Sequence, residues 1–184
     1  GYIEDIRIYN GVSQYTLTST ATNNNFTVAG NTQISTASSA YGGSSAYFDG
    51  SGDRLSVSIN PLSNLGTGDF TIEGWFNALD AGNRHVISAG AYGNGYADHL
   101  FYRTSGEWRY YSTTSNGSWN IVNAASFGTV ANDTWVHLAV EKKGSTFRLY
   151  RDGVGVTTFT ASPVYSGVKP LYISTYNGTL LPLN

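Results

Sequence analysis

Short segments in which apolar and polar residues alternate follow one another along most of this 184-residue chain. Residues 54–59 alternate strictly, with leucine, valine and isoleucine on one face and arginine and serine on the other. Residues 134–141 and 146–151 form a similar pair, joined by a turn at Gly144, which is typical of a hairpin. More than ten such segments predict an all-β fold, with two antiparallel sheets packed as a jelly-roll sandwich.

The composition agrees with this fold class and excludes several functions. Gly and Tyr are abundant, at 22 and 14 residues, while only 12% of the residues are charged. The formal net charge is −2 and no basic patch is visible, so no nucleic-acid partner is expected. Apolar runs are too short for membrane insertion. With no cysteine in the chain, disulfides and thiolate metal sites are excluded.

Several ordered motifs carry a family resemblance. They are Ala46-Tyr47-Phe48-Asp49-Gly50-Ser51-Gly52-Asp53-Arg54-Leu55, the segment 65–76 (LGTGDFTIEGWF), the segment 135–140 (WVHLAV) and the segment 147–154 (FRLYRDGV). Together they resemble the laminin-G-like, or concanavalin A-like lectin and glucanase, domains of bacterial and phage proteins. The resemblance covers roughly residues 1–15 and 40–178 and implies a concanavalin A-like sandwich.

The order of the segments differs from that family in one respect. Residues 1–10 resemble the strand that ends such domains, whereas the family's preceding strand is matched by residues 171–174. We therefore predict one domain over 1–184, with the displaced last strand in 1–15, a linker or loop with one or two short edge strands in 16–44, and the main body in 45–184. A displaced strand can close its own sheet or be donated to a neighbouring copy.

Carboxylates are the first place to look for enzymatic chemistry, because related sandwiches include glycoside hydrolases. A retaining glycosidase needs two closely spaced carboxyl groups. The Glu-x-Asp-x-x-Glu arrangement of the sandwich glucanases is absent, and Glu73, Glu107 and Glu141 stand isolated in the sequence. The three histidines show no ligand spacing. We therefore expect no enzymatic activity, with a glycoside hydrolase the least favoured function.

Calcium is the best cofactor candidate, because Ca²⁺ prefers carboxylate and backbone carbonyl oxygens. The resemblance to sandwich glucanases implies Glu4 as one ligand, with Glu where Asp is usual. Asp49 and Asp53 lie in a glycine-rich turn and are the other candidates. Aspartates in such turns also accept hydrogen bonds from their own backbone, which is the alternative interpretation.

Exposed aromatic side chains are the candidates for stacking on sugar rings. The segment 92–119 is rich in them, and the alternative interpretation is packing in the core or between strands. Trp75 and Trp135, within the family motifs, are expected to be buried. The predicted carbohydrate-binding residues are Trp108, Tyr110, Trp119, Tyr92 and Tyr96.

Two functional hypotheses follow. The first is a non-enzymatic structural or adhesive module of a larger extracellular or virion assembly, such as a phage fibre, appendage or surface filament, linked to neighbouring copies or other subunits by strand exchange. Residues 9–16 resemble a tail segment found in phage structural proteins, which favours this hypothesis. The alternative is a lectin-like carbohydrate-binding module. Strand exchange predicts that residues 1–10 pair with another chain, whereas a lectin predicts a site with exposed Trp or Tyr.

Overall fold

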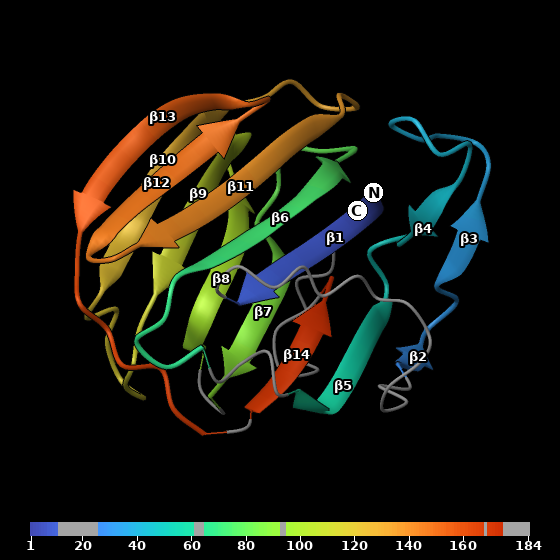
Figure 1. Cartoon of the computed structure of the whole chain (residues 1–184). Helices are drawn as coiled ribbons and strands as arrows, with labels where there is room; N and C mark the ends of the chain where they lie inside the picture. Colours follow the sequence, from blue (N-terminus) through green and yellow to red (C-terminus); the bar gives the residue numbers. More distant parts are fainter. Residues whose placement is uncertain (11–25, 61–64, 93–94, 168, 175–184) are drawn as a thin grey trace.

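The computed structural model describes residues 1–10, 26–60, 65–92, 95–167 and 169–174. They form two seven-stranded antiparallel sheets that face each other, which confirms the predicted all-β sandwich (Figure 1). Sheet A has the order β13 (Val154–Thr160), β12 (Thr146–Arg151), β11 (Val136–Lys143), β6 (Phe70–Asn77), β1 (Tyr2–Asn10), β4 (Ser45–Tyr47) and β3 (Gln33–Ser35). Sheet B has the order β10 (Val122–Thr129), β9 (Glu107–Ser112), β8 (Ala97–Thr104), β7 (Arg84–Ala91), β14 (Lys169–Ile173), β5 (Arg54–Asn60) and β2 (Thr27–Ala29).

The N-terminal strand β1 lies inside sheet A, between β6 and β4. Its ladder with β6 runs from Tyr2 opposite Asn77 to Asn10 opposite Phe70. A bulge interrupts the register between Glu4 and Arg7, where the intervening Asp5 has a φ of 52°. In this structure, therefore, the displaced strand completes the sheet of its own chain.

Two short edge strands lie within the segment predicted as a linker or loop; residues 11–25 of that segment lie outside the described part of the chain. β2 forms the edge of sheet B beside β5, and β3 forms the edge of sheet A beside β4. Gly30 sits in the turn between them with a φ of 71°. A Cβ atom there would lie 2.1 Å from a carboxylate oxygen of Asp53, so the turn requires glycine.

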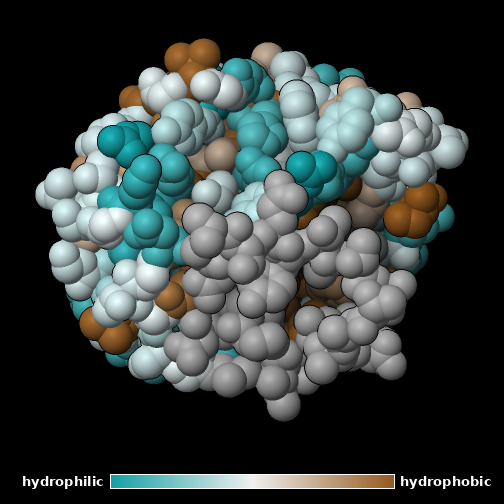
Figure 2. Space-filling model, in the orientation of Figure 1, coloured by the Kyte–Doolittle hydropathy of each residue, from teal (hydrophilic) through white to brown (hydrophobic). Residues whose placement is uncertain are grey.

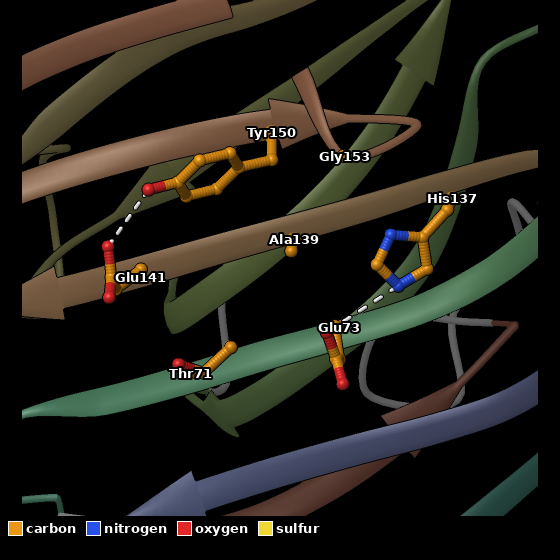
Figure 3. A pocket seen from close by; sticks show the side chains of 7 residues that line it. All are labelled: Thr71, Glu73, His137, Ala139, Glu141, Tyr150 and Gly153. Atoms are coloured by element: carbon orange, nitrogen blue, oxygen red, sulfur yellow. Dashed lines mark hydrogen bonds and ion pairs between the residues drawn. The ribbon is translucent and has the colours of Figure 1, made fainter. Parts of the chain in front are cut away.

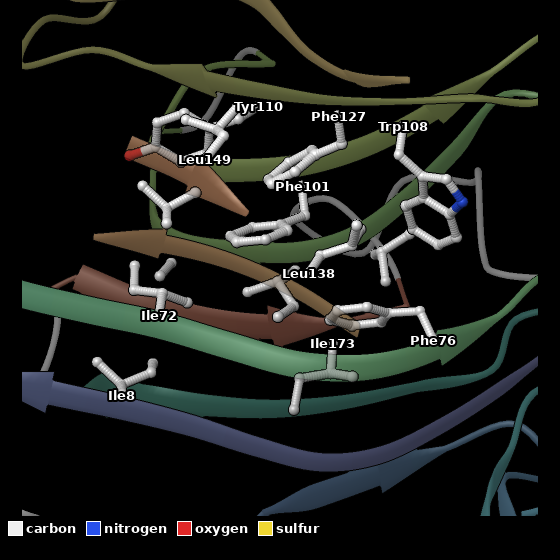
Figure 4. Packing of buried hydrophobic residues seen from close by; sticks show 14 of the residues in the cluster. Ile8, Ile72, Phe76, Phe101, Trp108, Tyr110, Phe127, Leu138, Leu149 and Ile173 are labelled. Atoms are coloured by element: carbon white, nitrogen blue, oxygen red, sulfur yellow. The ribbon is translucent and has the colours of Figure 1, made fainter. Parts of the chain in front are cut away.

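The core fills the space between the sheets, because alternate residues of each strand point inward. In β6, Phe70, Ile72 and Phe76 are buried, while Thr71 and Glu73 between them face outward. The labelled residues of Figure 4 show the packing, which includes contributions from β1, β6, β8, β9, β10, β11, β12 and β14. Truncating one such large side chain costs about 2–5 kcal/mol in comparable cores.

The outer face of sheet A is largely polar. Figure 2 shows it as mostly hydrophilic, with a few separate hydrophobic side chains. Exposed apolar residues on the described part of sheet A include Val154 and Val156 of the edge strand β13 and Ile34 of the edge strand β3. No helix in the described part of the chain has the length and hydrophobicity needed to cross a membrane.

Candidate functional site

Two of the predicted sugar-stacking residues, Trp108 and Tyr110, belong to the core. Their exposed fractions are 1% and 0%, and the Tyr110 hydroxyl lies 2.7 Å from Nδ1 of His99. Strand β9 alternates so that Trp108 and Tyr110 face inward while Tyr111 faces outward. The prediction for these two residues is therefore wrong, because the sequence did not indicate which face of β9 is covered by the opposite sheet.

Tyr96 and Trp119 do come together, on the outer face of sheet B. Their ring centroids are 5.1 Å apart, Trp119 lies 5.1 Å from Tyr111, and Tyr111 lies 5.9 Å from Tyr102. We call these four half-buried residues the aromatic row. Tyr111 and Tyr102 were not among the predicted ligand-binding residues, although their outward positions in β9 and β8 follow from the strand alternation.

Tyr92 directly follows β7, and its backbone N–H donates to the Tyr96 carbonyl at 2.7 Å. The Tyr92 hydroxyl donates to the buried Asp98 carboxylate at 3.0 Å, and the Lys169 ammonium stands 4.6 Å from the centre of the Tyr92 ring. Lys169 also binds Asp98 at 2.8 Å. Tyr92, Asp98 and Lys169 thus form a hydrogen-bonded cluster beside the aromatic row.

Glu4, a predicted calcium ligand, attaches a loop to β1. Its two carboxylate oxygens accept the backbone N–H groups of Ala40 and Gly42, both at 2.6 Å. A carboxylate held by two backbone donors already has the hydrogen-bond partners that a partly buried anion requires. Glu4 therefore has a structural role in fastening residues 40–42 to the centre of sheet A.

The carboxylates of Asp53 and Asp49 accept backbone N–H groups, in agreement with the alternative interpretation. The buried Asp53 carboxylate accepts the N–H groups of Asn31 at 2.7 Å and Asp49 at 2.8 Å, while Asp49 accepts the N–H of Ser51 at 2.7 Å. Within the described residues, no group of three or more histidine, aspartate or glutamate side chains is placed to hold a metal ion. Calcium binding stays a prediction.

Replacing Asp53 by alanine should lower the free energy of unfolding by about 1–3 kcal/mol, because two partly buried N–H groups lose their acceptor. Urea unfolding with and without added Ca²⁺ measures the effect. Asp49→Ala, at a more exposed carboxylate with one backbone partner, is the matched control and should cost less. A Ca²⁺-dependent gain in stability that disappears in Asp53→Ala would instead make Asp53 a calcium ligand.

A groove with a volume of about 230 Å³ lies on the outer face of sheet A. Its floor comes from the outward positions of three adjacent strands, β6, β11 and β12, so the fold itself brings the lining residues together. They are Thr71, Glu73, His137, Ala139, Glu141, Tyr150 and Gly153, all drawn in Figure 3.

Two carboxylates line this groove, each turned toward a neighbouring side chain (Figure 3). Glu73 lies 3.5 Å from Nε2 of His137, and Glu141 accepts the Tyr150 hydroxyl at 3.0 Å. Arg148 stands 3.6 Å from Glu141. Glu73 and Glu141, which stand isolated in the sequence, thus lie on one face of sheet A. Only the pairing of β6 with β11, which sets Ala139 opposite Glu73 and Thr71 opposite Glu141, brings them to one face.

Trp75 and Trp135 are also placed differently from the sequence expectation. Both are half-buried, not enclosed in the core. The Trp75 ring lies 5.3 Å from the His137 ring at the end of the groove, and the exposed Tyr41 packs edge-on against Trp75 at 6.0 Å. The Trp135 indole N–H donates to the Ser38 hydroxyl at 2.9 Å. The outer face of sheet A thus combines aromatic rings with hydrogen-bonding groups.

Residues 49–180, more than half of the chain, match the family described as the Concanavalin A-like lectin/glucanases superfamily. The chain therefore belongs to this family, and its sandwich has the concanavalin A-like fold. Curated protein sequences offer no match to the chain.

Similarity to solved structures extends over most of the domain at low sequence identity. The structure titled "HCR/D-Sa-GBL1/C" aligns with a TM-score of 0.57 and 14% identity over 80% of this chain, which spans 38% of the length of that one. The carbohydrate binding module CBM66 from Bacillus subtilis aligns with a TM-score of 0.46 and 18% identity, over 80% of this chain and 86% of that one. The conserved carbohydrate esterase from the Shiga toxin-encoding bacteriophage phi24B gives a TM-score of 0.45 and 14% identity, over 80% of each chain.

Proposed function

We propose that this domain is a non-enzymatic glycan-binding module that mediates adhesion at an extracellular or virion surface, with its ligand in the groove of sheet A. The observation that carries the proposal is the groove itself, where hydrogen-bonding side chains and aromatic rings share one open face. The family contains both lectins and glucanases, so the chemistry of the groove has to distinguish between binding and hydrolysis.

The groove has the types of group that a sugar requires. Glu73 and Glu141 are acceptors, Thr71 and Tyr150 carry hydroxyl groups, and the imidazole of His137 can donate or accept. The Tyr150 ring provides apolar surface of the kind that packs against a pyranose ring, and the half-buried Trp75 ring extends the same face beyond His137. Because all of these side chains project from paired strands, the site is held rigid before the ligand arrives.

Binding is favoured over hydrolysis by the partners of the two carboxylates. Glu73 and Glu141 are diagonal neighbours across the β6–β11 ladder, about 7–8 Å apart, which is wider than the pair of a retaining glycosidase and within the range of an inverting one. Each carboxylate already faces a side chain of the protein, His137 or Tyr150. New reducing ends after prolonged incubation with a bound oligosaccharide would contradict the non-enzymatic proposal.

Assembly by strand exchange is the second candidate function. It is favoured by the resemblance of residues 9–16 to a tail segment found in the sequences of phage structural proteins. The pairing of β1 with β4 and β6 of its own chain instead favours a monomer. Light scattering over a range of protein concentrations distinguishes the two. A constant monomer mass agrees with the glycan-binding proposal alone, and a mass that rises with concentration would support strand exchange.

The variant Tyr150→Ala should weaken glycan binding at least tenfold, because it removes the ring and the hydroxyl that holds Glu141. The measurement is a glycan array with the wild-type protein, followed by calorimetric titration of the strongest ligand. Trp119→Ala is the matched control, since it removes a half-buried ring from the aromatic row on the opposite sheet. Loss of binding in Trp119→Ala alone would move the site to the aromatic row, and an array without ligands would contradict the proposed function.

A further inference from the structure

The charge on the groove depends on which of its carboxylates have cationic partners. Glu141 has Arg148 at 3.6 Å, so its charge is largely balanced. Glu73 has only His137 at 3.5 Å among the ion pairs of the described residues, and an imidazole balances the charge only when it is protonated. Asp152, whose carboxylate accepts the backbone N–H of His137 at 2.9 Å, adds another negative charge at the same end.

The arginine opposite Glu73 is paired with another carboxylate, at the bulge in β1. Arg7 stands directly opposite Glu73 in the β1–β6 ladder. At the bulge, however, Asp5 takes up the guanidinium, with Nε 2.8 Å and a terminal nitrogen 2.5 Å from its carboxylate. The Tyr41 hydroxyl also donates to Asp5. Burial alone raises the pKa of Asp5, but these hydrogen bonds from Tyr41 and Arg7 lower it overall, which keeps Asp5 ionised and paired.

The charges around the groove therefore leave an excess of negative charge. Two of the carboxylates have arginine partners: Glu141 pairs with Arg148, and Asp5 pairs with Arg7. Among the residues that the structure describes, Glu73 on β6 and Asp152 in the turn after β12 have no arginine partner, and His137 on β11 lies beside both. The side chain of Glu73 is 22% exposed, so solvent screens it only in part and a bound ligand can approach it.

We propose that the groove selects glycans by charge: it prefers sugars with a protonated amine to neutral sugars of the same backbone, and it rejects sugars with a carboxylate. This inference rests on the proposed function and names the ligand class of that same site. Glu73 is the residue that sets the preference, because its carboxylate can form a charge-assisted hydrogen bond to an ammonium group. A ligand carboxylate at the same place would meet like charge.

The test compares three hexasaccharides by calorimetric titration at low salt: protonated glucosamine, N-acetylglucosamine, and N-acetylglucosamine alternating with glucuronic acid. We expect the cationic hexamer to bind about fivefold more tightly than the neutral one, the upper scale of one favourable partly exposed charge pair. The anionic hexamer should bind most weakly. Added salt should reduce the difference.

Glu73→Gln should bring the cationic and neutral affinities to within about twofold of each other. Glu107→Gln is the matched control, because Glu107 is a similarly exposed carboxylate, 26% against 22%, on sheet B. Equal affinities in the wild type, or a preference that survives in Glu73→Gln, would overturn the inference. If all three hexamers bind with equal affinity and Tyr150→Ala weakens that binding, the domain binds glycans in the groove without selecting them by charge.

If none of the hexamers binds, the charge inference fails, and the glycan array described above tests the proposed function separately.

Discussion

Deleting residues 1–10 should abolish the cooperative unfolding transition of this domain. Strand β1 bonds to β6 on one side and β4 on the other, so its loss divides sheet A and leaves two unpaired strand edges. It also removes Ile3 and Ile8 from the core, where they are 4% and 6% exposed. Each such loss costs about 2–5 kcal/mol, and together with the ladder they rival the 5–15 kcal/mol that stabilises a typical domain. Circular dichroism during urea unfolding measures the result.

A substitution on the same strand serves as the control. Arg7→Ala removes an exposed ion pair and should change the unfolding free energy by less than about 1 kcal/mol. A truncated protein that keeps a sharp transition would show that β1 is dispensable. Adding a peptide of residues 1–10 to the truncated protein extends the test, since recovery of the transition would show that another molecule can supply the strand.

Acidification from neutral pH to about pH 4 should destabilise the domain by roughly 3 kcal/mol, because the half-buried His85 and the buried His99 resist protonation. Burial lowers the pKa of His85 to about 4. It also lowers the pKa of His99 to about 3, with the nearby Lys169 acting in the same direction. In the unfolded chain both histidines take up a proton below about pH 6.5. Their stabilising contribution is therefore complete above pH 6.5 and is lost as the pH falls toward these folded-state values.

Asp98 acts in the opposite direction over part of this range. Burial raises its pKa to about 6, although Lys169 and Tyr92 lower it in part. The folded protein thus binds a proton near pH 6 that the unfolded chain takes up only near pH 4, which offsets the effect of one histidine. The net loss on acidification is correspondingly smaller than two histidines alone would cause.

Unfolding free energies measured from pH 7 to pH 4 separate these contributions. His99→Asn should flatten the pH dependence, because it removes one titrating group while leaving an amide near the Tyr110 hydroxyl. Asp98→Asn should steepen it, because the opposing group is lost. An unchanged slope in His99→Asn would mean that His99 titrates normally in the folded protein.

The fold was predictable because its determinants are local. Strict alternation in residues 54–59, the hairpin around Gly144 and the family motifs specify strands and turns from neighbours in sequence. The alternative interpretation of Asp49 and Asp53, as acceptors for the N–H groups of their own turn, came from the same local rules and is seen in the structure, whereas the contact of Asp53 with Asn31, 22 positions away, was not expected. Alternation separates the two faces of a strand, but it does not say which face the opposite sheet covers. Trp108, Tyr110, Trp75 and Trp135 were therefore misassigned.

By itself, the sequence determined the fold class, the family and the character of residues 1–10 as a strand. Only the tertiary structure decided that this strand enters sheet A of its own chain, and that Glu73 and Glu141, 68 positions apart in the numbering, line one groove with Tyr150. The physical reason is that a site on a sheet is made of cross-strand neighbours. Those neighbours depend on strand order and register, which are set by long-range hydrogen bonding and core packing. Strand order and register therefore cannot be inferred from any single segment of the sequence.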